Sequence, residues 1–198
     1  KDRQNMILIS GNTSHVYSVR NATIRFARTR PDVYHVLAHP GYLKHQKLRH
    51  NIVREKYFEL ISGYKAAIAT SANKQLDYPL AKYFEIAGWG CIPIFEEIDE
   101  LQKYGFEPNV HYFSLDQIYE PKFIQTLFDR EDVAKNAQKL ILERHTDIAR
   151  VNTIYQLMLD NLKALCHEVS LQKTECVVGA GYVVTPDNFY NLSDGVSR

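Results

Sequence analysis

The most constraining feature of this sequence is a regular alternation between short apolar runs and segments with helical spacing. Five apolar runs are expected to be strands, at residues Met6–Ser10, Val33–Ala38, Ala66–Thr70, Cys91–Phe95 and Val110–Ser114. Helical patterns separate these runs, so successive strands belong to βαβ units. Their side chains are apolar on both faces, which is typical of a parallel sheet covered by helices. The sequence therefore predicts an α/β fold with a doubly wound, Rossmann-like and mostly parallel sheet.

Helical spacing also predicts the elements between and after the strands. The expected helices are Val16–Thr29, Asn51–Ser62, Pro79–Gly88, Ile98–Tyr104, Pro121–Phe128 and a long C-terminal stretch from Val133 to about Leu165. A chain of 198 residues is a normal size for one domain. We therefore expect one Rossmann-like domain over residues 1–165 and an irregular C-terminal extension over residues 166–198.

Composition excludes several classes of protein. The 24 Lys and Arg residues nearly balance the 23 Asp and Glu residues, so nothing in the net charge of +1 favours a nucleic acid or an anionic membrane. The three cysteines form no zinc-ligand spacing. The sequence has no signal-peptide pattern and no apolar run of about 20 residues, so we expect a cytoplasmic protein without a transmembrane segment. Because the first residue is not Met, we expect a fragment, a processed chain or a trimmed form of a longer protein.

Small polar residues follow the first predicted strand, where ligands bind in open parallel sheets. The loop Gly11-Asn12-Thr13-Ser14 is either a phosphate loop or an ordinary strand-to-helix turn. Arg20, in the following helix, either reaches back to a phosphate or lies exposed. His15 is a weak candidate for a catalytic proton carrier, and a structural histidine is the commoner case.

The strongest motif runs from Asp77 to Ile94. Glu85 lies there among apolar residues in a helix that should pack on the sheet, and buried carboxylates need partners. One interpretation is that Glu85 forms a surface ion pair with Lys82, which lies three positions earlier. The alternative is that Glu85 accepts hydrogen bonds from ligand hydroxyls while Lys82 binds a phosphate. The pattern alone does not separate these interpretations.

The segment Lys82-Tyr83-Phe84-Glu85-Ile86-Ala87-Gly88-Trp89-Gly90-Cys91-Ile92-Pro93-Ile94 resembles the K-x-F-E-x-x-x-x-G-x-x-P-[VI] motif of GT-B glycosyltransferases. It is most similar to the family grouped with spore-coat glycosyltransferase-like proteins. The spacing of Asp77 and Glu85 resembles that of the two acids in the donor site of that superfamily. The resemblance covers about residues 5 to 155. It implies the C-terminal, donor-binding domain of an enzyme that transfers a sugar from a nucleotide-sugar to an acceptor.

The resemblance also implies roles for particular residues. Glu85 would bind the ribose hydroxyls, and Asp77 with Tyr78 would lie near the sugar or its phosphates. Lys82 and Arg20 would balance the diphosphate charge, which the backbone of Gly11, Asn12 and Thr13 would approach. No cofactor and no obligatory metal are expected, because cationic side chains and a helix dipole replace the metal in this fold. The acceptor-binding domain would lie upstream, outside this chain, and the catalytic base is unknown.

Asp77 departs from the pattern, since Glu is commoner at the first acid. The alternative to an active transferase is a non-catalytic GT-B-like binding or structural module of a larger protein. Another Rossmann-like enzyme is disfavoured, because no glycine-rich cofactor motif follows the first predicted strand.

Overall fold

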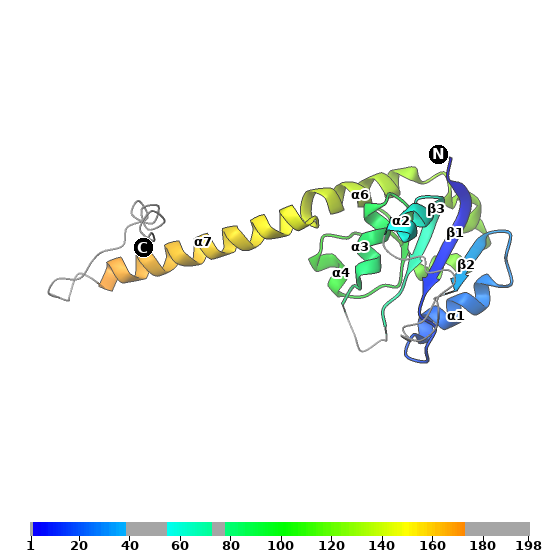
Figure 1. The fold of residues 1–198 in the computed structure, drawn as a ribbon, viewed down its shortest axis with the longest axis horizontal. Coiled ribbons are helices and arrows are strands. Elements are labelled where there is room, and N and C mark those ends of the chain that lie inside the picture. Colours follow the sequence, from blue (N-terminus) through cyan, green and yellow to red (C-terminus); the bar gives the residue numbers. More distant parts are fainter. Residues whose placement is uncertain (1, 39–54, 73–77, 173–198) are drawn as a thin grey trace, which may run out of the picture. The chain divides into compact units, whose positions relative to one another are not determined.

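The computed structural model describes residues 2–38, 55–72 and 78–172 of the chain. The chain divides into two units, Lys1–Arg150 and Val151–Arg198. The first unit contains the sheet and the helices that cover it (Figure 1). In the described ranges, no helix is both long enough and apolar enough to cross a bilayer.

A sheet of five parallel strands forms the centre of the first unit. Its strands are β1 (Gln4–Gly11), β2 (Tyr34–Ala38), β3 (Tyr64–Ala69), β4 (Ile92–Phe95) and β5 (Phe113–Ser114). They lie in the order β2-β1-β3-β4-β5, and every neighbouring pair is parallel. The predicted Rossmann-like α/β fold is thus confirmed. The fifth strand is much shorter than predicted, because residues 107–112 form turns before the ladder begins.

Helices connect the strands, and further helices come after the last strand in the sequence. They are α1 (Ser18–Ala27), α2 (Glu55–Ile61), α3 (Ala81–Gly88), α4 (Glu100–Lys103), α5 (Pro121–Leu127), α6 (Glu131–Arg144) and α7 (Asp147–Gln172), with a 3₁₀ turn, η1 (Leu115–Tyr119), after β5. The long helical stretch expected from Val133 is two helices, since α6 ends at its C-cap His145. His145 lies 2.8 Å from the Tyr104 carbonyl through its Nε2, and this tertiary contact accompanies the break.

Two apolar layers cover the sheet, one on each face. Alternate residues of β1 point to opposite layers, with Ile7 and Ile9 in the first and Leu8 in the second. The first layer is completed by α1, η1, α5 and the start of α6, and the second by α2, α3, α4 and the rest of α6. Both faces are therefore buried, as the continuous apolar runs of the strands predict.

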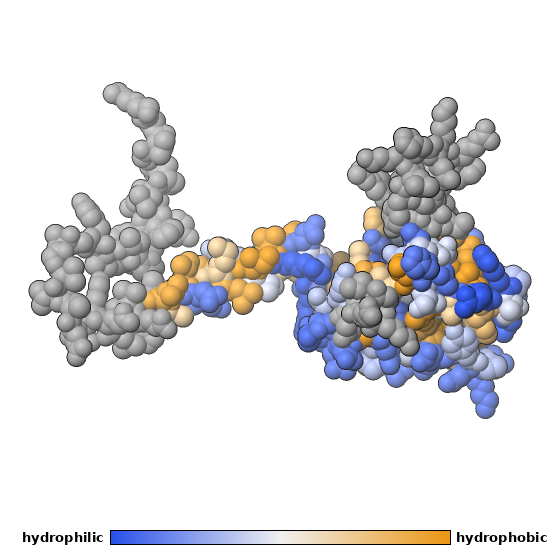
Figure 2. Space-filling view, turned by 90° about the horizontal axis from the view of Figure 1, so that it is seen from below, coloured by the Kyte–Doolittle hydropathy of each residue, from blue (hydrophilic) through white to orange (hydrophobic). Residues whose placement is uncertain are grey.

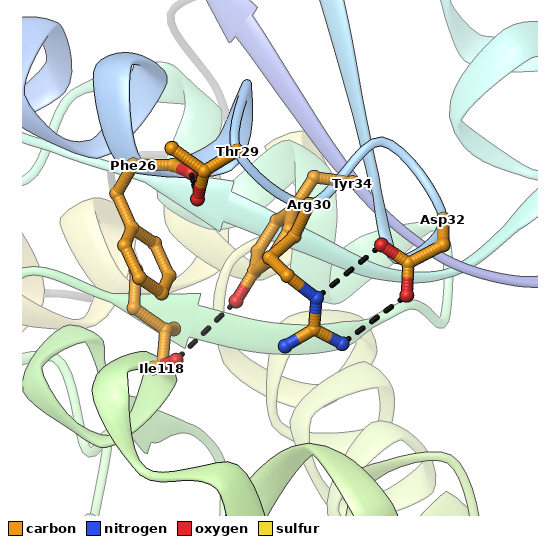
Figure 3. A network of polar contacts seen from close by, with 6 residues as sticks. All are labelled: Phe26, Thr29, Arg30, Asp32, Tyr34 and Ile118. Atoms are coloured by element: carbon orange, nitrogen blue, oxygen red, sulfur yellow. Dashed lines mark hydrogen bonds and ion pairs between the residues drawn. The ribbon is translucent and has the colours of Figure 1, made fainter.

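The edge strand β2 is fixed by contacts near its first residue, Tyr34 (Figure 3). The Tyr34 hydroxyl donates a hydrogen bond of 3.4 Å to the carbonyl of Ile118, in η1. The Phe26 ring of α1 packs edge-on against the Tyr34 ring at 5.9 Å. In the turn before β2, the Arg30 guanidinium pairs with Asp32 through two contacts of 3.3 and 3.2 Å. These contacts join α1, β2 and η1 on one side of the sheet.

Candidate functional site

The strand order creates a topological switch point between β1 and β3. The connection from β1 leads to β2 on one side, whereas β3 is followed by β4 on the other. Ligands of open parallel sheets bind beside such a point, at the carboxyl ends of the strands. β1 ends at Gly11 and β3 at Ala69, so the segments after these residues line the position where a ligand is expected.

Gly11 is the point at which cationic groups from two helices meet. Its backbone has a φ of +127°, a conformation that residues with a side chain rarely adopt. A Cβ atom at this position would lie 2.7 Å from Nη1 of Arg20 and 3.1 Å from Nζ of Lys82. The glycine thus lets a guanidinium and an ammonium approach the backbone at the end of β1.

Arg20 lies in the first turn of α1 and is only 5% exposed. Its Nε donates to the Thr70 hydroxyl at 3.0 Å, and its Nη2 donates to the Thr70 carbonyl at 3.1 Å. Its Nη1 donates to the Asn12 carbonyl at 3.0 Å, and the Tyr17 ring lies 4.3 Å from its guanidinium carbon. Arg20 therefore reaches back to the sheet, as one of the two interpretations of the sequence requires, and it joins the loop after β1 to the end of β3.

Lys82 reaches the same place from the first turn of α3. Its ammonium donates to the carbonyl of Ser10 at 2.7 Å and lies 3.0 Å from the Ser10 hydroxyl. That hydroxyl lies 2.8 Å from the Tyr57 hydroxyl, and the Tyr57 ring is 5.6 Å from the ammonium. Burial and, to a smaller extent, the charge of Arg20 lower the pKa of Lys82 to about 8, while Glu85 opposes the shift.

Glu85 follows Lys82 by about one turn of α3 and is partly buried. Burial raises the pKa of its carboxyl group, and the charge of Lys82 partly offsets that rise. No ion pair forms between these two residues, and within the described ranges the Glu85 carboxylate has no hydrogen-bond partner. The interpretation of Glu85 and Lys82 as a surface ion pair is therefore wrong, and the carboxylate is available to accept hydrogen bonds.

The helix starts around the switch point are positive, and the start of α5, with Lys122, shares this property. Neither α1 nor α3 has an acidic residue in its first turn, and instead they place Arg20 and Lys82 there. In contrast, α4, α6 and α7 begin with acidic residues, which complement the helix dipole. Two cations beside two positive helix ends disfavour the empty site and favour a bound anion.

Several residues of the site were not among the binding residues named from the sequence. Ser10 and Thr70 provide the acceptors for Lys82 and Arg20, and their positions at strand ends were the only available indication. Glu96, after β4, accepts hydrogen bonds from the backbone and hydroxyl of Ser71, at 2.8 and 3.0 Å, and so fixes the segment after β3. Tyr57 carries no sequence pattern that separates it from the other 12 tyrosines.

The other predicted site residues lie around this centre. Asn12 accepts a hydrogen bond of 2.8 Å from the Ser14 amide through Oδ1, which shapes the loop, and Thr13 in the same loop is exposed. His15 is also exposed there. Tyr78, before α3, is 49% exposed. Asp77 lies outside the described residues.

The start of α3 differs from the sequence-based expectation. The helix begins at Ala81 with Leu80 as its N-cap, so Pro79 precedes the helix instead of occupying its first turn.

A separate cavity of about 600 Å³ lies near the opposite, amino ends of the strands. Its walls include Arg3, Lys65 and Ile92, and Lys65 pairs with Glu131 at 3.7 Å. Because parallel sheets bind ligands at their carboxyl ends, this cavity is not the candidate site. Over the described parts of the chain, no group of three or more His, Cys, Asp or Glu side chains is arranged to hold a metal ion.

The fold and this cluster define the chain as a Rossmann-like α/β domain with a cationic site at its switch point. Comparison with protein-family models and a search of curated proteins both give no match.

Proposed function

We propose that this chain is the donor-binding domain of a glycosyltransferase and that its switch point binds the nucleoside diphosphate of a nucleotide-sugar. The observation that carries the proposal is that the side chains of Arg20 and Lys82 both approach the position that a Cβ atom of Gly11 would occupy. A diphosphate carries its charge on several oxygens, and a buried and a partly buried cation beside two helix starts match that charge. The acceptor would bind to another domain.

The amino group of Lys82 supports a direct role in binding phosphate. An ammonium has three N–H donors, and Ser10 receives two of them among the described residues. One donor therefore remains for a ligand oxygen. A bound phosphate would also stabilise the protonated form of Lys82, which burial disfavours in the free protein.

Glu85 supports the nucleoside part of the proposal. A carboxylate without a hydrogen-bond partner, about one turn along α3 from the phosphate-binding lysine, suits the two hydroxyl groups of a ribose. In this arrangement α3 contacts both parts of the nucleotide.

The same groups would assist the transfer reaction. When the bond between the sugar and the diphosphate breaks, negative charge grows on the leaving phosphate. Arg20 and Lys82, held in place by Thr70 and Ser10, would stabilise that charge without reorganising. These residues bind and stabilise the leaving group, and the base that activates the acceptor is not assigned.

Thermal unfolding of the 198-residue chain with UDP, GDP, ADP, CMP and their sugar conjugates tests the proposal. We expect one nucleoside diphosphate to raise the melting temperature by an amount that grows with the logarithm of its concentration above its dissociation constant, whereas NAD and S-adenosylmethionine do not. Calorimetric titration should then show that Lys82→Met weakens binding of both that nucleotide and inorganic pyrophosphate. Glu85→Gln should weaken only the nucleotide, because pyrophosphate has no ribose.

Lys122→Met is a matched control, because Lys122 is an exposed lysine of α5. Unchanged affinity in folded Lys82→Met, or the absence of stabilisation by every nucleoside diphosphate, would contradict the proposal. The second result would favour a non-catalytic module.

A further inference from the structure

Helix α7 has a feature that is independent of the proposed function. Large apolar side chains of this helix are exposed along its described length (Figure 2). Six of them are separated by alternating steps of three and four residues: Ile148, Val151, Tyr155, Met158, Leu162 and Leu165. Each of the six is more than half exposed. We call these six residues the α7 seam.

The spacing of the α7 seam specifies the kind of surface that covers it. Steps of three and four residues average 3.5, whereas an α-helix has 3.6 residues per turn. A stripe with this period is suited to a second helix that winds around the first, as in a coiled coil. In the sequence, the spacing continues with Val169, four positions after Leu165, and Glu168 precedes it.

The charges of the same segment identify the partner. The charged residues between Ile148 and Leu165 are Arg150, Asp160 and Lys163, and all three fall at heptad positions away from the seam and its flanks. The flanking positions between Ile148 and Leu165 hold uncharged residues instead, namely Asn152, Ile154, Leu159 and Asn161, and the flanking position before Ile148 holds Asp147. Charges at flanking positions normally select a different partner or exclude the chain's own copy. Between Ile148 and Leu165 no charge at a flanking position repels an identical helix.

We propose that α7 pairs with α7 of a second copy of this chain and forms a coiled-coil dimer through the α7 seam. A two-fold dimer uses the same surface on both subunits, and an uninterrupted apolar seam fulfils this requirement. Pairing also removes from water a contiguous row of apolar side chains that would otherwise favour non-specific association.

Sedimentation equilibrium of the 198-residue chain in reducing buffer tests this proposal, since it measures mass across a range of concentrations. We expect a mass of twice 22.9 kDa at micromolar concentrations. Met158→Glu should give a monomer, with the dissociation constant raised at least tenfold, because it places a charge in the seam.

Leu157→Glu is the matched control. Leu157 is 57% exposed and Met158 is 60% exposed, so both changes introduce the same charge at neighbouring and equally accessible positions. Leu157 lies outside the seam, and its variant should remain dimeric. The single tryptophan, Trp89, stacks on Phe58 in the first unit, so its fluorescence verifies that both variants keep that unit folded. A monomeric wild type, a particle larger than a dimer, or dissociation of both variants would overturn the proposal.

Discussion

The ionisation of Lys82 leads to a prediction at the scale of single residues. Burial lowers its pKa from 10.5 to about 8, so the ammonium is mostly protonated at pH 7 and about nine-tenths neutral at pH 9. Because only the charged form attracts a diphosphate, we expect nucleotide affinity to fall several-fold between pH 7 and 9. Isothermal titration calorimetry at several pH values measures this change.

Lys82→Arg provides the comparison for that experiment, because a guanidinium keeps its charge at pH 9. If the variant binds the nucleotide, its affinity should depend little on pH over this range.

The stability of the free protein should change in the opposite direction. Between pH 8 and 10.5 the unfolded chain binds more protons at Lys82 than the folded one, so its contribution to the unfolding free energy rises with pH. An affinity that does not change between pH 7 and 9 in the wild type would contradict a role for the Lys82 charge in binding.

At the scale of elements, the packing of α3 against α6 controls the position of the site. Ala137 of α6 is fully buried in the layer that also contains Ala87 of α3, and a Cβ on Gly88 would lie 3.3 Å from Ile141. Ala137→Leu should therefore destabilise the protein by about 1–3 kcal/mol, because the added carbons overpack the layer. It should also weaken nucleotide binding, since α3 carries Lys82 and Glu85. Urea unfolding and calorimetry measure the two effects.

Lys139→Leu is the control for this change. Lys139 is 72% exposed and forms only a surface pair with Glu143 at 3.8 Å, which contributes at most about 1 kcal/mol. If Ala137→Leu and Lys139→Leu have equal unfolding free energies, the prediction is contradicted. That result would mean that α6 has room to move away from α3.

The elements of the sheet were largely predictable, because apolar runs and helical spacing are local properties of the sequence. The five strands occur where the runs predict them, although β5 is short. The end of α6 at His145 was not predictable, since it coincides with a contact to the Tyr104 carbonyl that is remote in sequence.

The candidate site was predictable only in part, for a similar reason. Gly11, Arg20 and Lys82 come together because the carboxyl ends of parallel strands share one edge. The contacts of Thr70 with Arg20 and of Tyr57 with the Ser10 hydroxyl depend on the tertiary arrangement of strands and helices, which no local pattern specifies.

At the scale of the whole molecule, the two units should be separable. Among the residues that the structure describes, the buried apolar side chains of both layers end at Ile141, before the boundary at Arg150. A fragment of residues 1–150 should therefore unfold cooperatively and keep the nucleotide-induced stabilisation of the full chain, while remaining monomeric. Circular dichroism melts and sedimentation equilibrium measure these properties. Non-cooperative melting of the fragment would show that residues 151–198 are needed for the fold of the first unit.

The way in which α6 contributes to both layers also has a consequence for synthesis of the chain. Val133 and Ala134 belong to the layer on one face of the sheet, whereas Ala137, Leu140 and Ile141 belong to the layer on the other. A nascent chain can therefore complete neither layer until this late helix has left the ribosome. We expect the first unit to acquire its native packing in one step near the end of its translation, with the apolar strands exposed to chaperones until then.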